Sequence, residues 1–348
     1  MSARVDEPLP IVALTLGDAA GIGPELIGRL LAGGAIARAN VVIVGDRWLW
    51  EDGQRIAGTA VATAPVKRLA DVCDRADVAT PAFLCVDTVR QADVVRSRAQ
   101  AACGASALAI LDLCMDATTA GHIDAICFAP LNKQAMKLGG LRHEDELHYF
   151  AERLGVTGYF CEFNTLGNLW TARVSSHIPL KDAAAWLTQE RVVGATRLIH
   201  DSLRASGIAA PRIAVAAFNP HGGDGGTCGR EEVDIIEPAV RELRALGVPV
   251  DGPFPADTIF LKARAGLYEA IVTMYHDQGQ IAIKLMGFSK GVTVQGGLPI
   301  PITTPAHGTA YDIAGLGRAD ANAMTNAFDL ACRMGRAGRA ASRTIDTH

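Results

Sequence analysis

The 348-residue chain lacks several features that would assign it to a common class of protein. It has eight cysteines but no Cys-x-x-Cys pair, and several lie inside apolar runs, which is typical of buried thiols in a reducing compartment. No stretch concentrates lysine or arginine and the net charge is −4, so a surface for nucleic acid or anionic membranes is not expected. A charge-free apolar run of about 18 residues is also missing, and MSARVDEPLP lacks the apolar core of a signal peptide. We therefore expect a cytoplasmic protein that acts on small molecules.

Short apolar segments alternate with longer helical patterns along the chain. The predicted strands begin at Ile11, Val41, Phe83, Ala125, Ile213 and Ala270. Near-continuous apolar strands separated by helices are typical of parallel sheets covered on both faces. Helices are predicted over 101–120 and 231–246, the second because acidic residues start it, basic residues end it, and Gly247 and Pro249 follow. The fold class is therefore α/β.

The chain is longer than one typical domain, because single hydrophobic cores stop growing at about 250 to 300 residues. We expect two α/β/α domains. Residues 1–129 together with 300–348 form the first, and residues 130–299 form the second. The boundaries fall near the AICFAP run and near Pro299.

Three histidines stand in separate segments rich in glycine or proline, each after a predicted strand. They are His177 in SSHIPL, His221 in NPHGGDGG and His276 in YHDQG. Neutral imidazole is a common ligand of zinc and similar ions, and three protein ligands with an open position suit a catalytic metal. Each histidine taken alone could instead bind backbone carbonyls at a turn. Together they predict a discontinuous metal site.

The segment LTLGDAAGIGPEL joins a predicted strand to a predicted helix. Gly17, Gly21 and Gly23 allow close backbone approach, Pro24 suits the first helical position, and Glu25 lies in the first turn. The free N–H groups of the helix start could bind an anion. The spacing is not Gly-x-Gly-x-x-Gly, and a tight turn between strand and helix explains the glycines equally well.

A second glycine-rich segment lies near the C-terminus, in TTPAHGTAYDIAGLGRADANAMTNAFDLA. Histidine, aspartate and asparagine side chains there could pair with the polar edges of adenine and with ribose hydroxyls, or could serve as caps and turns. The candidate cofactor residues are His307, Gly308, Thr309, Asp312, Gly315 and Asn322.

Seven ordered blocks resemble the 4-hydroxythreonine-4-phosphate dehydrogenase family over nearly the full chain. They are GDAAGIGPEL, APLNKQAMKLGG, SSHIPL, NPHGGDGG, GPFPADTIF, YHDQGQIAIKLMGF and HGTAYDIAG. The resemblance implies that His177, His221 and His276 bind a divalent metal. The HGTAYDIAG loop and the asparagine after it are similar to the adenosine-binding loop of isocitrate and isopropylmalate dehydrogenases. The resemblance further implies that fold, with the active site in a cleft between two domains of a homodimer.

The implied activity is the NAD(P)-dependent and metal-dependent oxidation of a secondary hydroxyl β to a carboxylate, with decarboxylation. The family's substrate is 4-(phosphooxy)-threonine. Zinc is the first expectation for the metal, with magnesium, manganese or cobalt as alternatives, and NAD and NADP both stay open. Lys284 and Asp257 are candidates for proton transfer, while Lys284, Thr293 and Lys133 are candidates for binding substrate. Lys284 and Asp257 are also compatible with ordinary ion pairs.

Four positions depart from the family pattern. Thr293 and Ile302 stand where an asparagine and an arginine usually contact substrate, and a His-Thr pair is missing near Glu146 and Leu147. Isoleucine cannot replace the two-point grip of arginine on an anion. Relatives that oxidise cis-dihydrodiols of terephthalate likewise lack this arginine, so an aromatic diol carboxylate is the alternative substrate.

Two other classes of protein compete with a dehydrogenase. A metal-dependent hydrolase would use the three histidines to activate water, but it would have no use for the HGTAYDIAG loop. A binding protein without turnover would keep both pockets, but the intact histidines argue against it. The sequence therefore favours a dehydrogenase.

Overall fold

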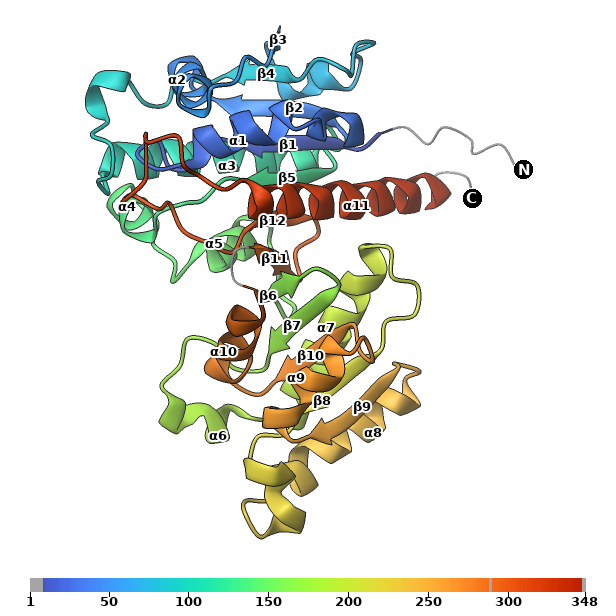
Figure 1. The fold of residues 1–348 in the computed structure, drawn as a ribbon. Helices are drawn as coiled ribbons and strands as arrows, with labels where there is room; N and C mark the ends of the chain where they lie inside the picture. The colour runs from blue at the N-terminus through green and yellow to red at the C-terminus, as the bar shows by residue number, and fades with distance from the viewer. Residues whose placement is uncertain (1–8, 288–289, 346–348) are drawn as a thin grey trace. The chain divides into compact units, whose positions relative to one another are not determined.

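The computed structural model describes residues 9–287 and 290–345. The chain divides into two compact units, Met1–Leu154 with Pro299–His348, and Gly155–Leu298. Most of the segment MSARVDEPLP, which is not expected to be a signal peptide, lies outside the described residues. Each unit is an α/β structure, which confirms the predicted fold class (Figure 1).

The first unit is built on a parallel sheet with the strand order β3-β4-β2-β1-β5-β12. Every residue of β1, β2 and β5 is buried, so both faces of these strands are covered. This explains why they are almost entirely apolar rather than alternating. The strands are β1 (Ile11–Thr15), β2 (Asn40–Gly45), β3 (Ala64–Val66), β4 (Ala82–Cys85), β5 (Ala125–Phe128) and β12 (Ile302–Pro305).

Six α-helices accompany this sheet among the described residues. The long α11 packs along β12, β5 and β1, and α3 packs on β5 and β1 (Figure 1). By length and composition α3 could cross a membrane, but half of it is buried against the first unit, as in a core helix. The helices are α1 (Gly23–Ala32), α2 (Arg47–Ala57), α3 (Ala101–Thr119), α4 (Lys133–Leu138), α5 (Glu146–Arg153) and α11 (Asn322–Ile345).

The first unit ends at Leu154, whereas the sequence placed the boundary at 129. Two glycines explain why α4 stays with the first unit. A Cβ on Gly104 of α3 would lie 1.9 Å from the carbonyl oxygen of Ala135. A Cβ on Gly139, directly after α4, would lie 2.2 Å from the backbone nitrogen of Ala105. The two helices therefore touch through their backbones. Composition near the AICFAP run gives no sign of this contact.

The second unit has the strand order β11-β6-β7-β10-β8-β9. Strands β7, β10, β8 and β9 are parallel, as predicted, but β6 is antiparallel to both β7 and β11. The wholly parallel sheet expected from the sequence is therefore wrong for this part of the chain. The strands are β6 (Cys161–Leu166), β7 (Leu169–Arg173), β8 (Ile213–Ala216), β9 (Val250–Phe254), β10 (Ala270–Thr273) and β11 (Val292–Gly296).

A hairpin signal marks the antiparallel pair. Leu166 pairs with Leu169 across a two-residue turn of Gly167 and Asn168, and Gly167 has a positive φ of 60°. Glycine followed by asparagine between two strands is a typical hairpin turn. Alternating burial along β6 agrees with a strand that has one face partly open.

The helices of the second unit pack on this sheet, with Ile259 and Phe260 of α9 in the core beside Ile271 of β10. The helix predicted over 231–246 is present, but its first turn is a π-helix (Glu232–Ile236) that continues into α8. The α-helices are α6 (Ala183–Trp186), α7 (Gln189–Ala205), α8 (Glu237–Ala245), α9 (Ala256–Arg264) and α10 (His276–Gly287).

Replacing Gly104 with alanine tests the contact between α3 and α4. The new methyl group would overlap the Ala135 carbonyl, so we expect the free energy of unfolding to fall by about 1–3 kcal/mol. Gly338 is the matched control because it is also helical and a Cβ there meets nothing within 4 Å. Gly338→Ala should stabilise α11 by about 0.5–1 kcal/mol. Urea midpoints that shift equally for the two variants would contradict the close approach.

Candidate functional site

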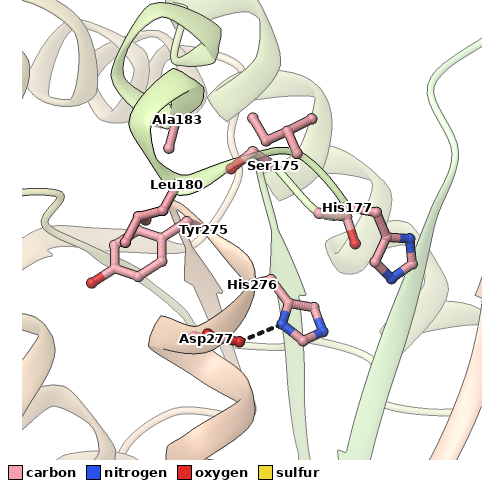
Figure 2. Close-up of a pocket in the computed structure, with 9 residues that line it drawn as sticks. Ser175, His177, Leu180, Ala183, Tyr275, His276 and Asp277 are labelled. Atoms are coloured by element: carbon pink, nitrogen blue, oxygen red, sulfur yellow. Dashed lines mark hydrogen bonds and ion pairs between the residues drawn. The ribbon is translucent and has the colours of Figure 1, made fainter.

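Two of the three candidate metal-binding histidines lie side by side in the second unit. His177 follows β7 and His276 begins α10 directly after β10. Since β7 and β10 are adjacent and parallel, their carboxyl ends meet at one edge, and the pairing continues beyond the strands from Ser175 N to Met274 O at 3.1 Å. The ring centroids of His177 and His276 are 5.8 Å apart (Figure 2).

The two rings line a cavity of about 280 Å³. In Figure 2 they lie at one end of it, while the ring of Tyr275 lies at the other. Nδ1 of His276 is 2.7 Å from Oδ1 of Asp277, so Nε2 is the nitrogen that can meet a ligand. A carboxylate on the second ring nitrogen orients many metal-binding histidines. The remaining lining residues are Ser175, Ser176, Ile178, Leu180 and Ala183.

The spacing of the rings fits one small cation. With zinc–nitrogen bonds of about 2.0–2.1 Å and a tetrahedral angle, two imidazole centroids lie about 5 Å apart. The observed 5.8 Å requires only a small adjustment of side-chain torsions. The donor set, two imidazoles with a carboxylate behind one of them, suits zinc or a similar divalent ion.

The third histidine, His221, is exposed on the segment Pro220–Gly226 that follows β8, and it does not line this cavity. Its φ of 54° is unusual for a residue other than glycine, and Asp224 has a φ of 45°. Such backbone strain is frequent at ligand-binding sites. The structure thus brings two of the three rings together and leaves His221 on a strained loop.

The base of the His221 loop nevertheless contacts the start of α10. The side chain of Gln278 donates a 2.7 Å hydrogen bond to the Ala217 carbonyl, and the ring of Phe218 lies edge-on to Tyr275 with 6.1 Å between centroids. On the other side, the buried carboxylate of Glu232 accepts hydrogen bonds from the backbone N–H of Phe218 and of Asn219, at 2.8 and 2.7 Å. Glu232 belongs to the π-helical turn that precedes α8, and its side chain is buried.

The remaining candidates of the second unit lie on α9, α10 and β11. Asp257 is exposed in the first turn of α9, and Lys284 is exposed two turns after His276 on the same face of α10. Thr293 is buried in β11 and its hydroxyl accepts a 3.3 Å hydrogen bond from the side chain of Asn164. Lys133 belongs to the first unit, where it is exposed at the start of α4.

In the first unit, the two glycine-rich segments singled out in the sequence contact each other. The backbone N–H of Ile22 donates to the carbonyl of Thr309 at 3.2 Å, and a Cβ on Gly21 would lie 2.9 Å from the Cβ of Thr309. A Cβ on Gly23 would lie 2.1 Å from the Leu16 carbonyl oxygen. Packing therefore accounts for these glycines, and the HGTAYDIAG loop lies against the start of α1.

Two buried carboxylates hold this loop. Glu25, in the first turn of α1, accepts a 2.9 Å hydrogen bond from the backbone N–H of Ala319 and one of 3.1 Å from Arg29. Arg29 in turn donates to the Gly317 carbonyl at 2.7 Å. Asp18 accepts 2.6 Å and 2.8 Å hydrogen bonds from the Tyr311 hydroxyl and the Ala20 N–H. Sequence reasoning did not assign either acid to the loop, because the partners lie almost 300 positions away.

Most of the candidate cofactor residues of the HGTAYDIAG loop are exposed to solvent. Gly308, Asp312, Gly315 and Asn322 are exposed, and His307 is half-buried with Nδ1 3.0 Å from the Gly308 carbonyl oxygen. Thr309 is buried against Gly21. Asn322 begins α11, as the sequence predicts, and its backbone N–H donates to Asp320. The loop therefore exposes polar side chains and backbone groups that can bind a ligand, while hydrogen bonds to Asp18 and Glu25 hold the loop in place.

Burial raises the pKa of the Asp18 carboxyl, which is 2% exposed, and the hydrogen bonds from Tyr311 and Ala20 oppose that rise. Burial and the neighbouring Asp18 also raise the pKa of the Tyr311 hydroxyl. Because the folded-state pKa of Asp18 lies above 3.8, this group favours folding at low pH. That contribution is lost as the pH rises through the raised value.

Several known proteins are similar to this chain over most of its length. The family profile described as pyridoxal phosphate biosynthetic protein PdxA matches residues 37–331. A Pseudomonas aeruginosa protein provisionally named 4-hydroxythreonine-4-phosphate dehydrogenase 2 is 55% identical, covering 94% of this chain and 98% of its own. A Bradyrhizobium diazoefficiens protein provisionally named D-threonate 4-phosphate dehydrogenase is 38% identical, with coverages of 96% and 99%.

Solved structures give the same result. The 4-hydroxythreonine-4-phosphate dehydrogenase of Klebsiella pneumoniae superposes with a TM-score of 0.82 at 34% identity, covering 95% of this chain and 99% of that one. A terephthalate 1,2-cis-dihydrodiol dehydrogenase of Burkholderia xenovorans LB400 superposes with a TM-score of 0.65 at 28% identity, with coverages of 91% and 98%.

Tyr311→Phe tests the anchor of the loop. It leaves a buried carboxyl without its hydroxyl donor, so we expect the free energy of unfolding to fall by about 1–3 kcal/mol. Losing the donor raises the pKa of Asp18 further, so the loss should grow as the pH rises from mildly acidic to mildly alkaline. Urea unfolding across this range measures it.

Tyr268→Phe is the matched control, because the Tyr268 hydroxyl donates to the exposed carboxylate of Asp251 at 3.2 Å. Its effect should stay within about 0.5 kcal/mol. A Tyr311→Phe variant as stable as this control at every pH would show that the Asp18 hydrogen bond does not hold the loop.

Proposed function

Because this chain belongs to the PdxA family and is an oxidoreductase that acts on CH–OH groups, we propose that it oxidises a small phosphorylated hydroxy acid. The proposed reaction takes hydride from a secondary hydroxyl β to a carboxylate and passes it to NAD or NADP, after which carbon dioxide leaves. The observation that carries this proposal is the pairing of His177 and His276 above one cavity at the edge of the second sheet. The hydrolase alternative lacks support, because the relatives are dehydrogenases.

We assign the dinucleotide to the loop that lies against α1 in the first unit. His307, Gly308, Asp312, Gly315 and Asn322 offer the polar groups that adenine and ribose require, and Thr309 holds the loop in place. The buried acids beneath the loop keep it rigid before the cofactor arrives, which lowers the entropy lost on binding. The choice between NAD and NADP is left to experiment.

We assign a divalent cation, zinc first among them, to His177, His276 and His221. A bound cation supplies Lewis acidity that lowers the pKa of a substrate hydroxyl. Two of the three rings lie 5.8 Å apart, close to the spacing that such an ion requires. The four glycines that follow His221 give its loop the freedom to bring the third ring in, and the hydrogen bond of Gln278 to Ala217 holds the base of the loop against α10.

Lys284 and Asp257 are the proposed groups for proton transfer. Lys284 lies two turns from His276 on one face of α10, a suitable place to bind a carboxylate or to return a proton to the carbon that loses carbon dioxide. Asp257 stands exposed at the start of α9, where it can accept a proton or orient a ligand. We further propose that the enzyme is a homodimer in which Lys133 of one subunit contacts the substrate bound by the other. We also propose that it is cytoplasmic, because its eight cysteines are free thiols.

The substrate we favour carries a phosphate, as in 4-(phosphooxy)-threonine or D-threonate 4-phosphate. The similar proteins named for such substrates are 55% and 38% identical to this chain, whereas the terephthalate dihydrodiol dehydrogenase is 28% identical. Ile302, which replaces the arginine of the family pattern, is fully buried in β12 and offers no charge. An aromatic cis-diol carboxylate is therefore the second candidate substrate, supported by the absence of a positively charged arginine at position 302.

A substrate panel tests the reaction. The enzyme is incubated with NAD or NADP and, in turn, 4-(phosphooxy)-threonine, D-threonate 4-phosphate and a terephthalate cis-dihydrodiol, and reduced nicotinamide is followed by absorbance. We expect signal from a phosphorylated hydroxy acid and its loss when a chelator removes the metal. Turnover of the diol alone would favour the alternative substrate, and no reduced cofactor with any compound would refute the proposal.

Histidine variants test the metal site. His276→Ala should lower kcat/KM by at least about 100-fold, because it removes a metal ligand rather than a neighbour of one. His200→Ala is the matched control: its Nδ1 is 2.9 Å from Oδ1 of Asp201, the same pairing with the next residue, but it lies on α7. Equal activity of the two variants would remove His276 from the site.

A further inference from the structure

A buried arginine lies behind the two paired histidines. Arg173, the last residue of β7, is 5% exposed, and its guanidinium makes three hydrogen bonds in different directions. Nη2 donates to Glu162 at 2.9 Å, Nη1 donates to the side-chain oxygen of Asn164 at 2.8 Å, and Nε donates to the hydroxyl of Ser176 at 2.9 Å. The planar fork of arginine is suited to such divergent bonding, which a lysine cannot reproduce.

The antiparallel strands of the second unit place these partners on one face. Asn164 of β6 stands opposite Thr171 of β7 and opposite Thr293 of β11, so Arg173, two residues beyond Thr171, points to the same side. Asn164 also donates to Thr293 at 3.3 Å and accepts a hydrogen bond from the side chain of Gln280. The hairpin of β6 and β7 thus forms a polar layer on a mostly apolar sheet.

This polar layer reaches both histidines. Ser176 directly precedes His177, so its hydrogen bond to Arg173 fixes the backbone from which the His177 ring extends. Gln280 lies one helical turn after His276, so its hydrogen bond to Asn164 holds the first turns of α10 against β6. One guanidinium therefore connects, directly and through Asn164, the two segments whose histidines are 5.8 Å apart.

We propose that Arg173 is a positioning residue that sets the spacing of His177 and His276 for a divalent cation. The inference rests on the metal site of the proposed function. The ion pair of Arg173 with Glu162 is by itself weak evidence for a role in stability, because apolar side chains of similar volume often replace buried ion pairs without loss of stability. Its hydrogen bonds to Ser176 and Asn164 instead give the histidines a defined geometry.

Cobalt binding tests the proposal without substrate or cofactor. Co²⁺ is titrated into metal-free protein and followed by its visible absorption, which reports both affinity and coordination geometry. Arg173→Met should weaken binding by about 10- to 100-fold, the usual range for residues that support metal ligands, and should change the band shape. Arg173→Lys should fail to restore it, since one ammonium group cannot serve three acceptors.

Arg212→Met is the matched control. Arg212 forms a comparable ion pair with Glu269 in the same unit, at 2.7 Å, but it is half-exposed and far along the sequence from either histidine segment. Its cobalt affinity should equal that of the wild type. Ser176→Ala, which removes one acceptor and keeps Arg173 and Glu162 paired, serves if Arg173→Met fails to fold, and it should weaken binding by a smaller factor of about 3 to 10.

The outcomes separate this inference from the proposed function. If the wild type binds Co²⁺ and His276→Ala does not, while Arg173→Met or Ser176→Ala binds as the wild type does with an unchanged spectrum, only the role of Arg173 is refuted. If wild type and His276→Ala bind equally, the metal site itself is refuted and the positioning role with it.

Discussion

The structure of the candidate site depends on the pairing of two parallel strands, β7 and β10. Because parallel neighbours end at the same edge of a sheet, the segments that leave them start side by side, and the backbone pairing persists from Ser175 to Met274 before the segments separate. His177 and His276 follow within two residues of that point. The two rings lie close together because only a few backbone torsion angles lie between the end of each strand and its histidine.

The cofactor loop obeys a different constraint. Its segment has no regular secondary structure between β12 and α11, so its own backbone cannot define its shape. Buried carboxylates of the α1 segment do so, Asp18 through Tyr311 and Glu25 through Ala319. Burying a carboxylate is costly unless donors satisfy it, so the acids and the loop stabilise each other. Glycines 21 and 23 permit the contact because any side chain there would overlap Thr309 or Leu16.

The two substrate-contact positions expected to depart from the family pattern lie in different units, Ile302 in β12 of the first and Thr293 in β11 of the second. Ile302 is a core residue of β12, and Thr293 is hydrogen-bonded to Asn164. Arg173 and Glu162 form a buried ion pair one strand away. Neither Ile302 nor Thr293 carries a positive charge, and the guanidinium of Arg173 is already paired with Glu162.

The amino-acid sequence by itself determined the α/β class, the strands with continuous apolar runs, the helices predicted over 101–120 and 231–246, and the motifs that carry the chemistry. Those features are local, because periodicity and glycine or proline placement act over a few residues. Tertiary structure alone decided that α4 stays with the first unit, that β6 pairs with the distant β11, and that Asp18 accepts a hydrogen bond from Tyr311. Each of these depends on contacts between residues far apart in the chain, whose energy is gained only when the whole unit has closed around them.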